Sequence, residues 1–432
     1  MIQDNIESFE QALFADLGKP RWEAGGEVAN IIPASLHAAS QLEEWAAPEK
    51  PQVQEWLQSW DPTVYSVPKG VALIIAPWNF PIVLCLLPLI GAISAGCPTV
   101  VKPSETTPTC SALLATLFPK YLDPEAYAVV NGAVEETNVL LANRWDHIFF
   151  TGGGNIGKII AAAAAQKLTP ITLELGGKSP VIVAEDCDVE LAAKRILWGK
   201  TQNCGQLCVA PDHVYVVRSV APAFIAALKK AYATFWPKPI FSPEMEWGKM
   251  INSRHHARVK KLLDRSKGTI IIGGEVEGDQ RISPTIVTNV QPDDSLMEEE
   301  IFGPILPVLE VENTDDAIKH IAALPSPLVL YAFTDSSKTK DKLLQQTRSG
   351  SIVFNDVYSQ MSVQQLPFGG FGESGYGAYF GKASFDTFSH RRPFVNVQPS
   401  AEPLFAARYR PYTEQAYNVA VGGMLRTKIP SA

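Results

Sequence analysis

Residues 71–102 read VALIIAPWNFPIVLCLLPLIGAISAGCPTVVK, and none of them carries a charge before the last lysine. An apolar run of this length is typical of a helix that spans a membrane. Here several residues interrupt it, and a helix in lipid would lose backbone hydrogen bonds that no water replaces. The interrupting residues are Pro77, Asn79, Pro81, Pro88 and Pro98. We therefore predict a βαβ unit with a buried strand, a buried helix and a second strand, over 71–76, 81–96 and 99–102.

The same alternation continues on both sides of this unit. Apolar residues recur at helical spacing near the N-terminus (Ile6, Phe9, Leu13 and Leu17) and again over 32–45, so we expect amphipathic helices that cover a sheet. After the unit, strand-like segments alternate with helix-like ones, which predicts a doubly wound α/β fold. The predicted strands are 128–130, 147–151, 180–183 and 214–217, with helices over 156–165 and 189–200.

Composition restricts the function classes and the compartment. The chain has 432 residues, of which 46% are hydrophobic and 19% charged, and its net charge is -8. These values are ordinary for a globular enzyme of two or more packed units, and they lack the basic excess that nucleic-acid binding requires. The six cysteines show no disulfide-framework spacing, and residues 1–14 carry acids where a signal peptide needs a basic start. We therefore expect a cytoplasmic protein.

A glycine-rich turn lies between the predicted strand 147–151 and the helix that follows it. Gly152, Gly154 and Gly157 satisfy the spacing G-x-G-x-x-G. At such a turn, backbone N–H groups and the helix dipole can bind a phosphate, which is typical of a dinucleotide site. Glycines also serve tight packing between a strand and a helix, so the turn alone leaves both interpretations open.

Glu174 follows that turn, in the sequence LELGGKSP over 173–180. An acid about twenty residues beyond the glycines binds a ribose hydroxyl in many dinucleotide folds. A carboxylate between leucines is also partly desolvated, which raises its pKa and suits a general base. A paired structural acid is the third interpretation, and the residues alone leave all three open.

Cys208 lies in the sequence NCGQLCVAP over 203–211, between a predicted helix and a predicted strand. A cysteine at a turn near a helix end has a stabilised thiolate and can act as a covalent nucleophile. The alternatives are an inert packed thiol, a zinc site with Cys204 and His213, or a thiol hydrolase that pairs the cysteine with a histidine. The zinc set lacks a clear fourth ligand, and none of the seven histidines is an obvious partner.

Asn79 is held between two prolines in PWNFP, at the end of the first predicted strand. A rigid amide donor in such a place can stabilise an oxyanion. A turn in which the asparagine satisfies nearby backbone groups is the alternative.

Together, these motifs and several turn-like ones resemble the aldehyde dehydrogenase superfamily in their order and spacing across most of the chain. The motifs are PWNFP (77–81), VKPSE (101–105), FTG (150–152) with Gly157, LELGG (173–177), GQLC (205–208), EIFGP (300–304) and PFGG (367–370). Segments over 367–393 and 408–413 resemble the class 3 or fatty aldehyde dehydrogenase branch. One residue departs from that branch, because Leu207 stands before the cysteine where a small polar residue is common.

The resemblance implies an aldehyde dehydrogenase fold in three parts. These are N-terminal helices with a Rossmann-like NAD(P)-binding domain over 1–175, an α/β catalytic domain over 176–370, and a C-terminal oligomerisation strand and tail over 371–432. We expect the tail to leave the core from Phe385 and to build a homodimer. Residues 419–429 are too short and too polar for the apolar anchor of membrane-bound members, so we expect no stable membrane span.

The resemblance also implies a role for each candidate residue. Cys208 attacks the aldehyde, Asn79 stabilises the oxyanion, and Glu174 activates the water that hydrolyses the thioester. No metal is implied. The cofactor residues are Lys102 and Glu105 at the adenosine ribose, Gly152 and Gly157 at the pyrophosphate, and Glu300 and Phe302 at the nicotinamide ribose and ring.

Preferences for cofactor and substrate follow from the same resemblance. Glu105 would repel a 2′-phosphate, which favours NAD over NADP, although this branch often accepts both. The substrate is an aldehyde, and the branch favours apolar aliphatic or aromatic ones. Two alternatives stay open: an acylating dehydrogenase that passes the thioester to coenzyme A, and a catalytically silent binding or structural member. Glu174 favours hydrolysis over acyl transfer.

Overall fold

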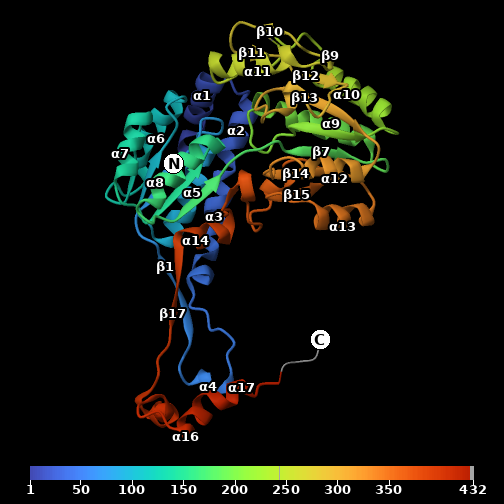
Figure 1. Cartoon of the computed structure of the whole chain (residues 1–432). Helices are drawn as coiled ribbons and strands as arrows, with labels where there is room; N and C mark the ends of the chain where they lie inside the picture. The colour runs from blue at the N-terminus through green and yellow to red at the C-terminus, as the bar shows by residue number, and fades with distance from the viewer. Residues whose placement is uncertain (243, 429–432) are drawn as a thin grey trace. The chain divides into compact units, whose positions relative to one another are not determined.

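The computed structural model describes residues 1–242 and 244–428. They form two compact units. Unit 1 comprises residues 1–45 and 68–389, and unit 2 comprises residues 46–67 and the chain from His390 on. Unit 1 contains two large sheets with helices packed on them (Figure 1). All the candidate site residues lie in unit 1.

The first sheet of unit 1 has six strands in the order β16-β6-β5-β2-β3-β4. Neighbouring strands are parallel except β16 and β6, which are antiparallel. Parallel strands require crossover connections, and helices supply them here. The strands are β2 (Ala72–Ile75), β3 (Thr99–Lys102), β4 (Tyr127–Val129), β5 (His147–Thr151), β6 (Ile171–Glu174) and β16 (Gly375–Tyr376), and the helices are α5 (Val83–Ala95), α6 (Pro108–Tyr121), α7 (Val134–Ala142) and α8 (Gly154–Ala165).

Both faces of this sheet are buried. On β2, Leu73 and Ile75 belong to one hydrophobic cluster, whereas Ala72 and Ile74 belong to another. The cluster around Leu73 continues into α7 and α8. Successive side chains of a strand point to opposite faces, so a strand is apolar throughout only when both of its faces are covered. This explains the uninterrupted apolar run from which the βαβ unit was predicted.

The second sheet of unit 1 has seven strands in the order β15-β14-β7-β8-β13-β12-β9. Only β9 runs antiparallel to its neighbour. The strands are β7 (Pro180–Val183), β8 (His213–Val217), β9 (Thr269–Ile272), β12 (Thr285–Thr288), β13 (Ile305–Val311), β14 (Val329–Phe333) and β15 (Ser351–Phe354), with helices α9 (Val189–Thr201), α10 (Ala221–Phe235), α11 (Ser253–Arg265), α12 (Thr314–Ala322) and α13 (Ser337–Gln346). Shorter elements are η2 (Gln202–Gly205), β10 (Val276–Glu277), β11 (Arg281–Ile282), η3 (Ser295–Met297), η4 (Ser359–Ser362) and η5 (Gly372–Ser374).

Three helices precede the first sheet: α1 (Ile6–Leu17), α2 (Arg21–Ala29) and α3 (Ile31–Ala46), after the short turn η1 (Gln3–Asn5). Phe9, Leu13 and Leu17 are buried, as their helical spacing predicts. α1 packs against α2 and against α6, so it reaches the first sheet through a helix of that sheet.

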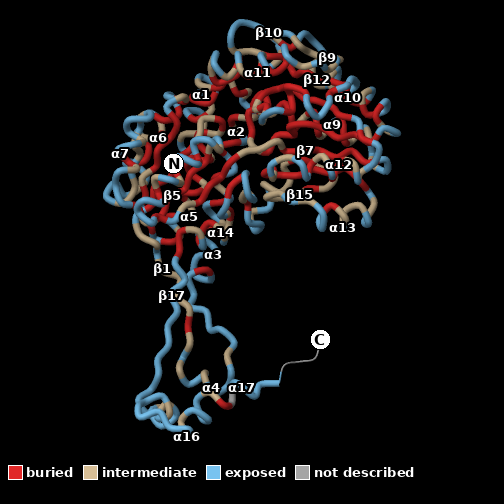
Figure 2. Tube along the Cα trace, viewed as in Figure 1, coloured by how far each residue is buried: buried red, intermediate tan, exposed pale blue. Residues whose placement is uncertain are grey.

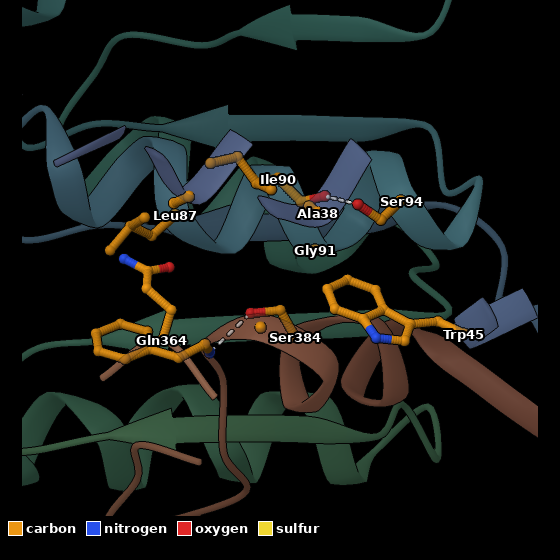
Figure 3. Close-up of a pocket in the computed structure, with 11 residues that line it drawn as sticks. Ala38, Trp45, Leu87, Ile90, Gly91, Ser94, Gln364 and Ser384 are labelled. Carbon is orange, nitrogen blue, oxygen red and sulfur yellow. Dashed lines mark hydrogen bonds between the residues drawn. The ribbon is translucent and has the colours of Figure 1, made fainter. Parts of the chain in front are cut away.

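Helices α3, α5 and α14 (Gly381–Phe388) meet around a small cavity of about 10 Å³ (Figure 3). Gly91 of α5 approaches Ser384 of α14 so closely that a Cβ at Gly91 would lie 2.6 Å from the Ser384 Cβ. A cavity of this size holds one water molecule at most. None of the candidate residues lines it, so this is a packing contact between helices.

Unit 2 is assembled from two distant segments of the chain, and most of its residues are exposed (Figure 2). β1 (Thr63–Pro68) and β17 (Ser389–Phe394) form a two-stranded sheet. Arg391 forms an ion pair with Glu49 at 2.6 Å. The Asn396 N–H donates to the Trp60 carbonyl at 2.6 Å. The helical elements are α4 (Glu55–Gln58), η6 (Pro399–Ala401), α15 (Glu402–Phe405), η7 (Ala406–Arg408), α16 (Glu414–Tyr417), η8 (Asn418–Gly422) and α17 (Gly423–Leu425).

The tail differs from the expectation. The sequence predicts that it leaves the core from Phe385, but Phe385 and Phe388 are buried in unit 1, and unit 2 resumes only at His390. The Phe388 ring packs against His147 and Phe149 of the first sheet. Aromatic residues bury a large apolar area, which explains why α14 stays with the core.

The boundary predicted between residues 175 and 176 falls between β6 of the first sheet and β7 of the second. Two segments cross the predicted division: residues 46–67 belong to unit 2, and residues 371–389 belong to unit 1, where β16 joins the first sheet. Residues 429–432 of the predicted C-terminal part lie outside the described residues. Across residues 1–242 and 244–428, no helix has both the length and the apolar character needed to cross a membrane.

Candidate active site

A pocket of about 720 Å³ opens where the parallel strands of the first sheet end. Its wall includes Ile75, Lys102, Thr151 and Glu174, the last residues of β2, β3, β5 and β6. In open parallel sheets, ligands bind at the carboxyl ends of the strands. A volume of this order is typical of pockets for cofactors and other small molecules.

All the candidate residues except Gly157 line this pocket. Gly157 lies inside α8, and a Cβ there would be 2.8 Å from the Leu175 Cδ2 atom. It therefore lets the helix pack closely on the sheet, and it is not among the residues that line the pocket. The residues that line the pocket are Asn79, Lys102, Glu105, Gly152, Glu174, Cys208, Glu300 and Phe302.

The glycine turn presents an open backbone to the pocket. Gly152, Gly153 and Asn155 line the wall, and α8 begins at Gly154. A Cβ at Gly153 or Gly154 would meet no atom within 4 Å, so a ligand can approach the main chain directly. A helix N-terminus with free N–H groups attracts phosphate. The turn and the pocket volume together fit a dinucleotide.

Lys102 and Glu105 stand at another edge of the same pocket. The Lys102 ammonium donates to the Pro103 carbonyl at 2.8 Å and lies 3.4 Å from the Glu105 carboxylate. Lys102 is buried, whereas 48% of the Glu105 side chain is exposed. The Glu105 carboxylate is thus exposed to a ligand, and the buried Lys102 ammonium lies beside it.

Cys208 follows a strained loop that bends the chain back toward the pocket. Asn203, Cys204 and Gly205 have φ values of 48°, 54° and 72° in succession. At Gly205 a Cβ would lie 2.2 Å from the Gly303 carbonyl oxygen, so only glycine fits. Left-handed backbone at three consecutive residues is costly and is found mainly at functional sites.

The Cys208 thiol is held in its neutral form. Burial, and after it the nearby carboxyl groups of Glu300 and Glu174, raise its pKa to about 12. Backbone N–H groups of Cys208 and Val209 act in the opposite direction. The thiol therefore needs a proton acceptor or a bound ligand before it becomes a strong nucleophile.

Glu174 ends β6 with an unsatisfied carboxyl group. Both of its carboxylate oxygens are buried and have no hydrogen-bond partner among the described residues. Burial raises its pKa well above the usual value. Its main chain is fixed, because the Gly152 N–H donates to the Glu174 carbonyl at 3.0 Å. A buried polar group without a partner is a mark of a functional site.

Asn79 lies on the loop after β2 and lines the same pocket as Cys208. Its side-chain amide donates to the Gln206 carbonyl at 3.1 Å. An amide nitrogen carries two hydrogens, so one donor remains for a ligand. The sequence left open a turn in which the amide satisfies nearby backbone groups, but its acceptor here is the carbonyl of a residue 127 positions further along the chain, and the second hydrogen of the amide stays available.

Glu300 and Phe302 lie on a loop before β13. Burial raises the pKa of Glu300 to about 8, Asp212 adds to the rise, and the Gly177 N–H opposes it. The Glu300 Oε1 atom is buried and has no partner within the described part of the chain. The Phe302 ring contacts Trp78 edge-on, with ring centres 5.4 Å apart.

Three charged residues that sequence reasoning missed hold this loop in place. Arg258 donates to the Glu300 carbonyl at 3.2 Å and to the Ile301 carbonyl at 2.7 Å. Lys178 forms a buried ion pair with Asp212 at 2.5 Å. Asp212 in turn accepts the Ile301 N–H at 2.9 Å. In the sequence these residues look like ordinary surface charges, because their partners lie far along the chain.

The zinc alternative finds no geometry to support it. Cys204 packs in the hydrophobic cluster of the second sheet, whereas Cys208 packs against a different cluster. His213 is buried 3.5 Å from the Asp212 carboxylate. In the part of the chain that the structure describes, no three His, Cys, Asp or Glu side chains are placed to share a metal ion. No hydrogen bond joins Cys208 to a histidine in that part either.

The chain is similar to known proteins along most of its length. The chain matches the model of the aldehyde dehydrogenase family over residues 1–393. It is 43% identical over 413 residues to an aldehyde dehydrogenase of Rattus norvegicus named "dimeric NADP-preferring", covering 95% of this chain and 90% of the relative. It is 44% identical over 418 residues to aldehyde dehydrogenase family 3 member A2 of the same species, covering 96% and 85%. The solved structure of Staphylococcus aureus AldH in a substrate-bound state matches with a TM-score of 0.92 and 36% identity, covering 98% of this chain and 92% of that one.

Proposed function

Since this chain belongs to the aldehyde dehydrogenase family and is an NAD(P)-dependent aldehyde dehydrogenase, we propose that Cys208 is its nucleophile and Glu174 its general base. The observation that carries the proposal is that Cys208, Glu174 and Asn79 open on the same pocket as the glycine turn. The nucleophile, the base and the oxyanion donor therefore all reach a ligand that lies beside a dinucleotide.

The first half of the reaction makes a carbon–sulfur bond. The Cys208 thiol passes its proton through water to bulk solvent, and the thiolate adds to the aldehyde carbon, so that the carbonyl oxygen becomes an oxyanion. The remaining N–H of the Asn79 amide and the Cys208 backbone N–H stabilise this charge. When bound, the nicotinamide supplies the acceptor for the hydride that leaves the carbon. A thioester on Cys208 remains.

The second half is hydrolysis. Glu174 takes a proton from a water molecule, and the hydroxide adds to the thioester carbon. The carbon–sulfur bond then breaks, which releases the carboxylic acid and regenerates Cys208. The raised pKa of Glu174 suits this step, because a carboxylate with a higher affinity for protons is a stronger base. No described residue forms a hydrogen bond to its carboxylate oxygens that would first have to break.

The proposed cofactor residues line one pocket, and the dinucleotide would lie along it. Lys102 and Glu105 would hold the adenosine ribose, the turn at Gly152 the pyrophosphate, and Glu300 and Phe302 the nicotinamide ribose and ring. The unsatisfied Glu300 Oε1 supports this assignment, because a ribose hydroxyl would give it the missing hydrogen bond.

The exposed Glu105 carboxylate supports a preference for NAD, since it would repel the 2′-phosphate of NADP. The neighbouring Lys102 ammonium acts in the opposite direction, and one relative is named for its preference for NADP. We therefore expect turnover with both cofactors and the higher specificity constant with NAD.

Apolar aliphatic or aromatic aldehydes are the proposed substrates. Three tyrosines, Tyr331, Tyr358 and Tyr379, lie close enough to Cys208 that its charge adds to the rise in pKa that burial causes at each. Trp198 packs on Tyr358 with ring centres 5.5 Å apart. Aromatic side chains this close to the nucleophile support an apolar chain or ring as the substrate.

A cytosolic homodimer is the proposed form of the enzyme. All six cysteines are free, which is usual in a reducing compartment. Unit 2 exposes large apolar side chains, among them Phe394, Val395, Leu404 and Tyr412. Exposed apolar groups of this size favour contact with another protein surface, and one relative is named dimeric.

The test is absorbance of NADH or NADPH with purified protein and a series of aldehydes, from short aliphatic to long-chain and aromatic. We expect turnover without coenzyme A in the wild type and none in Cys208→Ala. Turnover that requires coenzyme A would instead support the acylating alternative. If the wild type forms no reduced cofactor with any aldehyde, the result would support the alternative of a catalytically silent binding or structural protein.

A further inference from the structure

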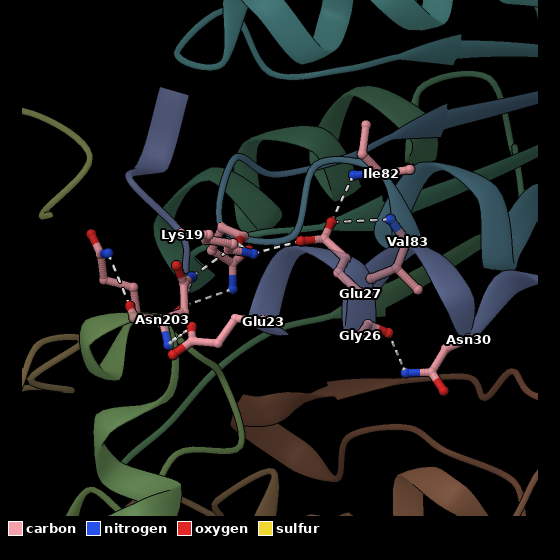
Figure 4. Close-up of polar contacts among 10 residues, drawn as sticks. Lys19, Glu23, Gly26, Glu27, Asn30, Ile82, Val83 and Asn203 are labelled. Carbon is pink, nitrogen blue, oxygen red and sulfur yellow. Dashed lines mark hydrogen bonds and ion pairs between the residues drawn. The ribbon is translucent and has the colours of Figure 1, made fainter. Parts of the chain in front are cut away.

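Helix α2, which belongs to neither sheet, contacts two loops of the proposed catalytic site: the loop before Cys208 and the loop after β2 (Figure 4). Glu23 and Glu27 are one helical turn apart on α2, so both project from the same face. Glu23 accepts the Asn203 N–H at 2.8 Å, in the loop that leads to Cys208. Glu27 accepts the N–H groups of Ile82 at 3.0 Å and Val83 at 3.3 Å, directly after the PWNFP segment.

Lys19 lies at the centre of this network. Its ammonium pairs with the Glu27 carboxylate at 2.5 Å and donates to the Asn79 main-chain carbonyl at 2.9 Å. It also lies 3.7 Å from the centre of the Phe80 ring. The side chains of Lys19 and Glu27 are 1% and 0% exposed. A buried ion pair is costly to desolvate, so one that brings no net stability needs another reason to be retained.

The reason lies in what Lys19 does to Asn79. The Asn79 carbonyl accepts two hydrogen bonds, from the Lys19 ammonium and from the Asn203 side-chain amide, which is also 2.9 Å away. The Asn79 side chain is held separately by the Gln206 carbonyl. With the main chain and the side chain both fixed, the free N–H of the amide has a single direction. The effect of an oxyanion donor depends on that direction being set before the reaction.

We propose that Lys19 is a positioning residue for the oxyanion donor: it holds the main chain of Asn79 so that the side-chain amide faces the carbon attacked by Cys208. This inference rests on the proposed function. An apolar residue at position 19 would fill the same space but would donate nothing to the Asn79 carbonyl. Glu27 keeps the ammonium in place and fixes the start of α5 with its other oxygen.

The test replaces the ion pair by neutral groups of similar size. In Lys19→Met/Glu27→Gln, the glutamine oxygen still accepts the N–H groups of Ile82 and Val83, whereas the ion pair, the donor to the Asn79 carbonyl and the ammonium beside the Phe80 ring are lost. We expect kcat to fall about 10- to 100-fold with the aldehyde KM within about 3-fold of the wild type. The single variant Glu27→Gln keeps the lysine but removes its counter-ion, so its kcat should fall by less than that of the double variant.

A matched control comes from the same helix. Arg21 pairs with Glu10 on the surface at 2.9 Å and touches neither loop of the site, so Arg21→Met should retain wild-type turnover. Thermal unfolding of each variant separates loss of folded protein from loss of kcat per folded molecule. If Lys19→Met/Glu27→Gln does not fold, Lys19→Met/Glu27→Leu replaces it, because apolar substitutes for a buried ion pair are often neutral or stabilising.

A double-mutant cycle with Asn79→Ala decides how Lys19 acts. If it acts through Asn79, removing the ion pair in the Asn79→Ala background lowers kcat by less than about 3-fold further. An equal fall in both backgrounds, or no fall with Asn79 present, overturns the proposal. Failure of the proposed function gives a different result. The wild type then shows no turnover, or Asn79→Ala shows full turnover, with any residue at position 19.

Discussion

Glu174 on β6 and Gly375 on β16 face each other as antiparallel partners at the edge of the first sheet. Gly375 has a φ of 121°. A Cβ on it would lie 1.9 Å from the Leu173 carbonyl oxygen. The strand that carries the proposed general base is therefore held by a residue whose place only glycine can take.

Gly375→Ala should accordingly destabilise the protein and slow turnover. We expect the free energy of unfolding to fall by roughly 2–4 kcal/mol, since the substitution adds both backbone strain and a steric clash. Urea denaturation followed by fluorescence measures this. An unchanged midpoint would show that β16 moves aside freely and that the pairing with Glu174 is dispensable.

Gly26→Ala should have the opposite effect and serves as its control. Gly26 lies within α2, and a Cβ there would meet no atom within 4 Å. Alanine in an exposed helix interior is favoured over glycine by about 0.5–1 kcal/mol. The same denaturation experiment should show a higher midpoint, with kcat unaltered. A lower midpoint would mean that α2 depends on bending at this position.

Glu174→Gln should separate oxidation from hydrolysis. Cys208 still attacks and the hydride still leaves, so about one reduced cofactor per site forms in a burst, after which the thioester accumulates. Stopped-flow absorbance gives the burst, and mass spectrometry of the quenched protein detects the acyl group on Cys208. Steady turnover at the wild-type rate would assign the base to another residue.

The pH dependence of kcat should follow the same residue. The raised pKa means that Glu174 keeps its proton to a higher pH than an ordinary glutamate, and only the ionised form accepts a proton from water. In the wild type, kcat should therefore rise with pH. This limb should disappear in Glu174→Gln, and a variant that retained it would place the titrating group elsewhere.

Glu300 should make stability depend on pH. Its pKa of about 8 in the folded chain exceeds the 4.5 of an exposed glutamate, so between these values the folded state binds more protons than the unfolded state. Stability from this group is complete at low pH and is lost as the pH rises toward 8, with a slope of at most about 1.4 kcal/mol per pH unit. Relative to Glu300→Gln, the ligand-free wild type should lose unfolding free energy across this window. Parallel curves for the two proteins would contradict the raised pKa.

Glu105→Gln should shift the cofactor preference. Removing the exposed carboxylate leaves the Lys102 ammonium to attract a 2′-phosphate, so the ratio of kcat/KM for NADP over NAD should rise by about 10-fold. Initial rates with each cofactor give the ratio. An unchanged ratio would mean that this carboxylate does not meet the adenosine ribose.

Much of the first sheet could be predicted from the sequence, because local signals determine it. The apolar run at 71–102 gave two strands and a helix within a few residues of β2, β3 and α5. Parallel strands place their carboxyl ends at one edge, and this is why Asn79 and Glu174, far apart in the chain, open on one pocket.

The supports of the site could not be predicted, because they depend on long-range contacts between residues with ordinary local surroundings. The Lys19 ammonium meets a carbonyl 60 residues away. Arg258 lies on a strongly amphipathic helix, where sequence reasoning treats a charge as a solvated one. β16 has only two residues, too few for any periodicity, and its position depends on the strained backbone at Gly375.

The two segments of unit 2 are separated by roughly 320 residues of chain, so the ribosome completes the first long before the second. A ribosome adds about 5–20 residues per second, so β1 emerges tens of seconds before β17 exists. Until then the apolar and backbone groups of residues 46–67 have no strand to pair with. Residues 46–67 of a nascent chain thus stay without their partner strand, and a premature stop before β17 leaves β1 unpaired.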